Sequence, residues 1–199
     1  MNEQVGNQLF PVFLQMNHLR TLVVGGGNVA LEKLTALLND SPCAIITVVA
    51  KEISPAVRVF VQDFPSVSLH ERAFVDTDLD DVDVVVVAAD NVELSAHVRT
   101  ESRKRHLLIN VADKPDLCDF YLGAVVKKGD LKFGISTNGK SPTIAKRIKE
   151  LLNEAIPEEI DETLAYMSRL RNLLKGDFTE KVRALNAHTV SLLTSKEKK

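Results

Sequence analysis

The chain has 199 residues, 45% hydrophobic and 26% charged, which predicts one domain with an appendage or two small domains. Its net charge of −2 and its lack of any apolar run near the roughly 18 residues that span a bilayer give no reason to expect nucleic acid or a membrane as a partner. The chain start does not resemble a signal peptide and the two cysteines fit no metal spacing, so we expect a cytoplasmic protein without a metal site.

Strands and helices alternate in the first part of the chain. Runs that are apolar or alternate in polarity predict strands over residues 21–24, 44–50, 66–71, 82–90 and 107–113. The segments between them predict helices from residue 29, over residues 53–64 and over residues 92–106. This alternation is typical of a parallel sheet with helices on both faces and right-handed crossovers. We therefore expect an α/β, Rossmann-like, doubly wound domain over residues 1–113.

The pattern changes after residue 113. Residues 120–137 predict two strands joined by a Lys-Gly-Asp turn, which is typical of a hairpin. A helix is expected next, with Ser141 as its N-cap and Pro142 at its first position. Two further helices are expected, and Asp177 with Glu180 resembles a capping box at the start of the second. The remainder is therefore expected to form a hairpin-plus-helix region, 114–154, and a C-terminal helical segment, 155–199.

Three consecutive glycines connect the first strand to the first helix. Gly25, Gly27 and Ala30 satisfy the pattern G-x-G-x-x-A inside a strand–turn–helix unit. The first glycine permits a tight turn, the second lets a diphosphate approach the backbone, and the small third residue lets the helix pack on the strand. The helix N-terminus offers free N–H groups to the phosphates. The turn predicts a dinucleotide site formed by Gly25, Gly26, Gly27, Asn28, Val29 and Ala30.

The ends of two other strands are expected to contribute to this site, because a dinucleotide lies across the carboxyl ends of the strands in this fold. Ala50 ends the second strand, and Asp90 and Asn91 follow the fourth. Lys51 would favour a cofactor 2′-phosphate and Glu52 a 2′-hydroxyl, and both can equally be solvated loop charges. The choice between NAD and NADP therefore stays open at this point.

Asp113 ends the last predicted strand, in the segment NVADKPDLCDF. One interpretation is that it caps the proline-bearing turn that follows, as Asp commonly does. The other is that it aims a carboxylate at the nicotinamide region of a bound dinucleotide. Spacing alone does not choose between the two.

Three motifs follow one another along the chain: FPVFLQMNHLRTLVVGGGNVALEK, NVADKPDLCDF and ISTNGKSPTIAKRIKELL. In this order they resemble the precorrin-2 dehydrogenase family, which includes the N-terminal part of sirohaem synthases, and the resemblance runs from about Leu9 to Gly176. It implies NAD-dependent oxidation of precorrin-2 to sirohydrochlorin, with insertion of Fe2+ in some members. It further implies Asp113 as the catalytic residue and a homodimer formed through the region 114–154.

The resemblance also implies a tetrapyrrole-binding role for the segment that precedes the Ser-Pro helix. Together with a nearby cation for the substrate carboxylates, this gives the expected substrate-binding residues Ser136, Thr137, Gly139, Lys140 and Ser141. Two positions depart from the family pattern. Gly123 stands where many members have proline, and Asn138 stands where glycine is frequent.

A protein of another class is the alternative. A regulatory module that senses NAD(P) would need the glycine turn but no catalytic carboxylate. The combination of Asp113 with a helix that begins Ser-Pro favours the enzyme, because a sensor has no need of both.

Overall fold

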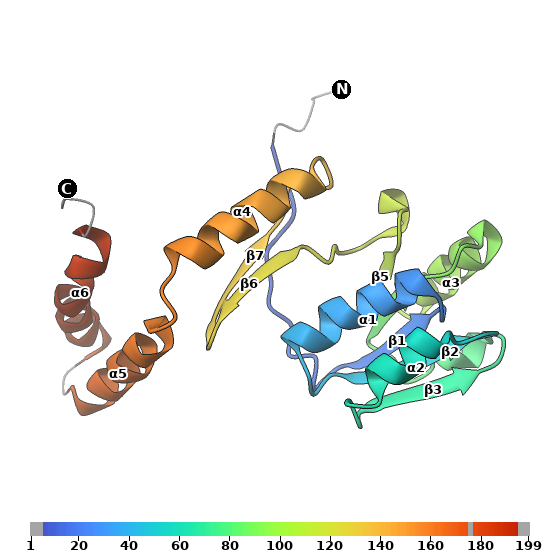
Figure 1. Cartoon of the computed structure of the whole chain (residues 1–199), viewed down its shortest axis with the longest axis horizontal. Helices are drawn as coiled ribbons and strands as arrows, with labels where there is room; N and C mark the ends of the chain where they lie inside the picture. The colour runs from blue at the N-terminus through green and yellow to red at the C-terminus, as the bar shows by residue number, and fades with distance from the viewer. Residues whose placement is uncertain (1–5, 175–176, 195–199) are drawn as a thin grey trace. The chain divides into compact units, whose positions relative to one another are not determined.

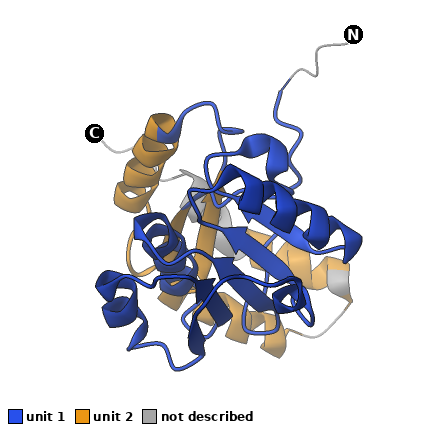
Figure 2. Ribbon diagram, turned by 90° about the vertical axis from the view of Figure 1, so that its right-hand side faces the viewer, with its two compact units in different colours: residues 1–124, 136–142 blue, residues 125–135, 143–199 orange. Residues whose placement is uncertain are grey.

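The structure is a computed structural model, and it describes residues 6–174 and 177–194. The described residues divide into two compact units, which are treated separately below (Figure 2). Unit 1 contains residues 1–124 and 136–142, and unit 2 contains residues 125–135 and 143–199. The functional division at residues 113 and 154 stays a prediction.

Unit 1 contains a five-stranded parallel sheet in the order β3-β2-β1-β4-β5. The strands are β1 (Arg20–Val24), β2 (Ile45–Ala50), β3 (Val67–Glu71), β4 (Val84–Val87) and β5 (Leu108–Val111). The order reverses at β1, so the crevice between the ends of β1 and β4 is the position where this fold binds its ligands. The Rossmann-like fold predicted from the sequence is confirmed. Strands β4 and β5 are shorter than predicted because the residues after them leave the sheet as loops.

Helices cover both faces of this sheet (Figure 1). Helices α1 (Asn28–Asp40) and α2 (Pro55–Val61) share one apolar cluster with Val23 and Val86 of the sheet. Helix α3 (Val92–Lys104) shares the other cluster with Leu22 and Val85. Neighbouring residues of a strand point to opposite faces, so the unbroken apolar strands serve two cores at once.

The three helices begin in different ways. Ser54 Oγ accepts a hydrogen bond from Val57 N at 3.3 Å, and caps α2. Asn91 Oδ1 accepts from Leu94 N at 2.8 Å, and caps α3. The N-cap of α1 is Gly27, which has no side chain to donate or accept. The first-turn N–H groups of α1 are therefore left for another acceptor.

Unit 2 contains the hairpin and the C-terminal helices that the sequence predicts. The elements are β6 (Ala124–Lys128), β7 (Leu131–Ile135), α4 (Pro142–Ala155), α5 (Ile160–Leu173) and α6 (Phe178–Thr194). Asp161 Oδ1 of α5 accepts from Asp130 N in the hairpin turn at 2.8 Å. Asp177 Oδ1 accepts from Glu180 N at 2.9 Å, as expected for the start of α6. None of the helices in the described ranges is long and apolar enough to span a bilayer.

Candidate active site

The glycine turn after β1 is held between the loops that follow β4 and β2. A Cβ on Gly25, whose φ is +129°, would lie 2.3 Å from Ala88 O. A Cβ on Gly26 would lie 2.3 Å from Glu52 O. Both glycines are thus required by contacts inside the protein. A Cβ on Gly27, in contrast, would have no atom within 4 Å, so this side of the turn is open.

The open side of Gly27 adjoins the start of α1. Gly27 O accepts from Leu31 N at 3.0 Å, and the N–H groups of residues 28–30 have no carbonyl acceptor inside the helix. Ala30 is fully buried in the core under the helix. Free amides and the positive end of the helix dipole fit a diphosphate, and the missing Cβ of Gly27 leaves room for it. The residues present therefore fit the dinucleotide predicted from the sequence.

The loop after β2 is tied to the glycine turn by its backbone. Ser54 N donates to Gly26 O at 2.9 Å, and Ile53 N donates to Glu71 Oε1 at 2.9 Å. The Ile53 N–H and the Arg58 guanidinium lower the pKa of Glu71. Ala50 is buried beneath Gly26. This predicted cofactor residue therefore lies beside the turn, and its small side chain allows the close approach.

The loop after β4 lies on the other side of the turn. It begins with Ala88, whose carbonyl faces Gly25, and continues to Asp90 and Asn91. Asp90 is exposed, whereas the Asn91 side chain is used as the cap of α3. The structure thus places both residues on the loop that borders the turn, and their role toward a cofactor stays a prediction.

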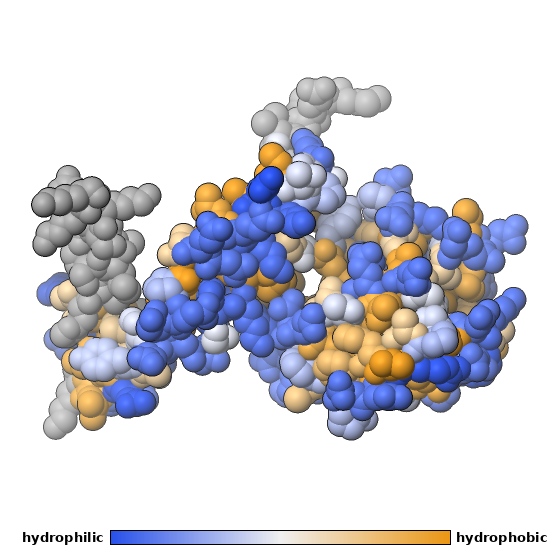
Figure 3. Space-filling view, viewed as in Figure 1, coloured by the Kyte–Doolittle hydropathy of each residue, from blue (hydrophilic) through white to orange (hydrophobic). Residues whose placement is uncertain are grey.

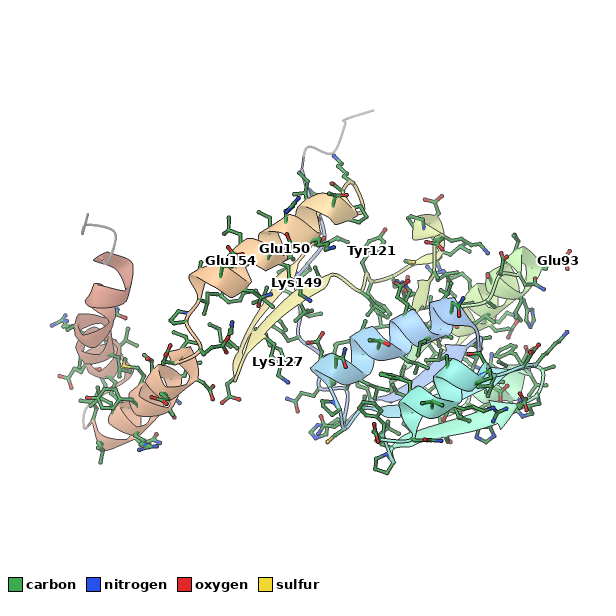
Figure 4. The ribbon with its side chains drawn as sticks, viewed as in Figure 1. Glu93, Tyr121, Lys127, Lys149, Glu150 and Glu154 are labelled. Atoms are coloured by element: carbon green, nitrogen blue, oxygen red, sulfur yellow. The ribbon has the colours of Figure 1, made fainter. Side chains whose placement is uncertain are left out.

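Asp113 follows β5 in the left-handed region, with φ of +57°, and lines a pocket of about 150 Å³. The pocket is lined by Lys33, Asn110, Val111, Ala112, Asp113, Lys114, Pro115, Cys118, Tyr121 and Leu122. Lys33 belongs to α1, and Tyr121 lies on the segment that joins β5 to β6 (Figure 4). The pocket therefore connects Asp113 with the helix that begins at the glycine turn.

The sequence analysis missed the two cations of this pocket. Lys33 Nζ lies 2.9 Å from Glu32 Oε1, and Lys114 Nζ donates to Ser95 Oγ at 3.0 Å. The only local signal for Lys33 is a charged residue on α1 between the buried residues Ala30 and Leu34. For Lys114 there is no such signal, because its partner is on α3.

The expected substrate segment closes a loop on itself. Thr137 Oγ1 accepts from Ser141 N at 3.2 Å and lies 3.2 Å from Ser141 O, as a donor to it. Ser136 Oγ accepts from Asn138 N at 3.2 Å. Asn138 and Gly139 have φ of +54° and +73°. Asparagine tolerates this region better than other non-glycine residues, which explains how Asn138 can stand where glycine is frequent. The substrate role of the segment stays a prediction.

A family model described as "Putative NAD(P)-binding" matches residues 12–124, the stretch that contains the sheet, the glycine turn and Asp113. The chain belongs to this NAD(P)-binding family. The prediction of a nicotinamide dinucleotide cofactor is thereby confirmed. A second model, described as "Sirohaem biosynthesis protein central", matches residues 128–155 of this NAD(P)-binding protein.

Individual proteins named as siroheme synthases are also similar to this chain. The "Siroheme synthase" of Psychrobacter cryohalolentis is 31% identical over 88% of this chain and 32% of that protein. The "Siroheme synthase" of Methylococcus capsulatus is 34% identical over 87% of this chain and 34% of that protein. The chain thus spans about a third of the length of these curated relatives.

A solved structure described as "SirC, precorrin-2 dehydrogenase" has the same fold. Its TM-score is 0.70 at 26% identity, and the alignment covers 92% of this chain and 89% of that one. The resemblance to the sirohaem-synthesis family that the three motifs indicated is confirmed.

Proposed function

We propose that this chain oxidises precorrin-2 to sirohydrochlorin with NAD+ as the hydride acceptor, as a step of sirohaem synthesis. The observation that carries the proposal is the pocket that Asp113 and Lys33 of α1 line together. It combines a carboxylate with the helix that offers free amides to a dinucleotide, in an NAD(P)-binding fold. The names of the relatives supply the substrate class.

The reaction removes one hydride and one proton from the macrocycle. The nicotinamide of a bound dinucleotide accepts the hydride. The amides at the start of α1 would hold its diphosphate, and Gly27 leaves the space for it. Asp113 would take the proton as general base, because its exposed carboxylate lines the pocket.

Lys33 would bind the substrate in this proposal. The substrate carries several carboxylates, and an ammonium group at the edge of the pocket attracts one of them. Since Lys33 is on α1, the same helix would orient both the cofactor and the substrate. Lys33→Met should therefore raise KM for precorrin-2 more than it changes the Kd of NADH.

The test is anaerobic incubation of the protein with enzymatically made precorrin-2 and NAD+, followed by absorbance. Asp113→Asn should lower kcat by about 100-fold or more, with the Kd of NADH unchanged within about twofold. The matched control is Asp116→Asn, because Asp116 is an exposed carboxylate three positions further along the same loop and outside the pocket lining. It should turn over precorrin-2 at the wild-type rate.

Two results would contradict the proposal in different ways. A wild-type protein that binds NADH but leaves precorrin-2 unchanged would be an NAD(P) sensor, the alternative function. If the Asp113→Asn variant has the wild-type kcat, the proposed reaction stands but Asp113 is not its general base.

Insertion of Fe2+ into sirohydrochlorin is a separate part of the proposal. Iron would be a substrate here, and Asp113 would accept the two pyrrole N–H protons one after the other, passing each to water, as the metal replaces them. No three His, Cys, Asp or Glu side chains of the described residues cluster as a resident metal site. Sirohydrochlorin with Fe2+ should give sirohaem faster with the protein than without it, and equal rates would limit the protein to oxidation.

A further inference from the structure

The loop that carries Asp113 returns to the strand that it leaves. Asp119 N donates to Ile109 O at 2.7 Å, and Ile109 N donates to Asp119 Oδ2 at 3.2 Å. Asn110 Nδ2 donates to Phe120 O at 2.8 Å. The residues between these hydrogen bonds, including Asp113, therefore form a loop whose two ends are hydrogen-bonded to each other at β5.

Helix α3 holds this loop at two points. The Arg99 guanidinium makes a bidentate pair with Asp119, with Nη1–Oδ2 and Nη2–Oδ1 distances of 2.5 and 2.7 Å. One turn earlier, the buried Ser95 accepts a hydrogen bond from Lys114, the residue after Asp113. Arg99 is itself buried, so its planar fork has little freedom to move. Both contacts lie on the same face of α3, at i and i+4.

Asp113 needs such support. Its φ of +57° lies in the left-handed region, which Asp tolerates better than most non-glycine residues but which is still sparsely populated, so contacts that hold the loop help to maintain this backbone conformation. We propose that the Arg99–Asp119 pair is a positioning clamp, which fixes the loop so that the Asp113 carboxylate stays in the pocket. The inference rests on the proposed function for the role of Asp113 as base.

The chain offers a matched control for a purely structural role. Arg72 and Asp78 make a second bidentate pair in the same unit, at 2.8 and 2.5 Å. Asp78 Oδ2 also accepts one backbone N–H, that of Val75, as Asp119 does from Ile109. This second pair stabilises the connection between β3 and β4, which contributes no residue to the pocket.

The experiment compares Asp119→Asn with Asp78→Asn in the full chain, by thermal unfolding, NADH binding and turnover of precorrin-2. Both variants should lose stability, because each leaves an arginine without its carboxylate. Only Asp119→Asn should lower kcat, by about tenfold or more, with the Kd of NADH unchanged within about twofold. Equal losses of kcat in the two variants, or none in Asp119→Asn, would overturn the clamp.

A double-mutant cycle then tests whether Asp119 acts through Asp113. In the Asp113→Asn background, Asp119→Asn should leave the residual rate unchanged, because the group that it positions is already absent. A loss by the same factor in both backgrounds would overturn the inference.

A readout without turnover separates this inference from the proposed function. Cys118 adjoins Asp119 where the loop is hydrogen-bonded to β5. In the Cys43→Ser background, which removes the exposed thiol, Asp119→Asn should speed the reaction of Cys118 with a chromogenic disulfide reagent, and Asp78→Asn should not. Unchanged Cys118 reactivity in Asp119→Asn would overturn the clamp even if the wild type oxidises precorrin-2. A wild type without turnover would refute the proposed function instead. Arg99→Lys, which keeps the charge but loses the fork, serves if Asp119→Asn does not fold.

Discussion

The sulfur atom of Cys118 hydrogen-bonds to the backbone of Val111 and so joins the two ends of the loop that carries Asp113. Cys118 Sγ lies 3.2 Å from Val111 N, as acceptor, and 3.2 Å from Val111 O, as donor. Burial raises the pKa of Cys118, and the Val111 N–H offsets part of that rise. The thiol therefore stays protonated at neutral pH and keeps its proton to donate.

The raised pKa of Cys118 predicts its reactivity. In a Cys43→Ser variant, which leaves Cys118 as the reporting thiol, modification should reach half its maximal rate above the usual thiol pKa of about 8.5. The sign follows from burial, which disfavours the thiolate, so less of the reactive form is present at any given pH. The measurement is the rate of a chromogenic disulfide reagent against pH. The same variant in urea is the control, and a folded midpoint below the unfolded one would contradict the prediction.

The strand–turn–helix element shows that its three glycines serve different purposes. Gly25 and Gly26 are required by the carbonyls of Ala88 and Glu52, which belong to the neighbouring loops. Gly27 has no such neighbour, and it alone leaves open space at the start of α1. In the G-x-G-x-x-A pattern the second glycine is the position where the diphosphate approaches the backbone, and the open space beside Gly27 agrees with this.

The different surroundings of Gly26 and Gly27 predict that alanine at the first lowers stability and alanine at the second weakens cofactor binding. Gly26→Ala should destabilise the protein by about 1–3 kcal/mol, because its Cβ would meet backbone. Gly27→Ala should change the free energy of unfolding by less than about 1 kcal/mol, yet weaken NADH binding by about tenfold, because its Cβ enters the space for the diphosphate. Urea unfolding and a fluorescence titration with NADH measure the two quantities. Wild-type NADH affinity in Gly27→Ala would contradict the proposed cofactor site.

Exposed apolar side chains lie on helix α4 and near the N-terminus. On α4, Ile144, Ile148 and Leu151 lie on one face of the helix and are 57%, 40% and 58% exposed. Figure 3 shows apolar surface along this helix. Near the N-terminus, Phe10 and Phe13 are 85% and 72% exposed. Because exposed apolar surface is costly in water, we propose that a second copy of the chain covers this face of α4 in the homodimer that the family resemblance implies.

The homodimer proposal predicts which substitution separates the two copies. Leu151→Glu should convert the dimer to a monomer, because it places a charge in the apolar face of α4. Lys146→Glu puts the same carboxylate on the opposite, polar side of α4, where Lys146 is exposed, and should leave the dimer intact. The measurement is molar mass by light scattering after gel filtration. A monomeric wild type, or a dimeric Leu151→Glu variant, would contradict the proposal.

Local features explain what could be predicted from the sequence. Apolar β-branched runs indicate buried strands wherever they occur, and the alternation of strands with helices limits the connections to a parallel sheet. Gly25 and Gly27 identify the turn because their spacing follows from backbone geometry alone. The start of α2 at Ser54 and Pro55 was predictable for the same reason, since a helix cap involves residues only a few positions apart.

The sequence by itself determined the Rossmann-like sheet and the position of the glycine turn, because each depends on neighbours along the chain. The role of Asp113 as base stays a prediction that the family resemblance implies. Only the tertiary structure decided which side chains share a pocket and which hold it in place. Lys33 and Asp113 line one pocket from two separate elements, and Arg99 pairs with Asp119 at a separation of 20 residues. Such pairs leave no periodic signal, because they form where folding brings a helix face and a loop together.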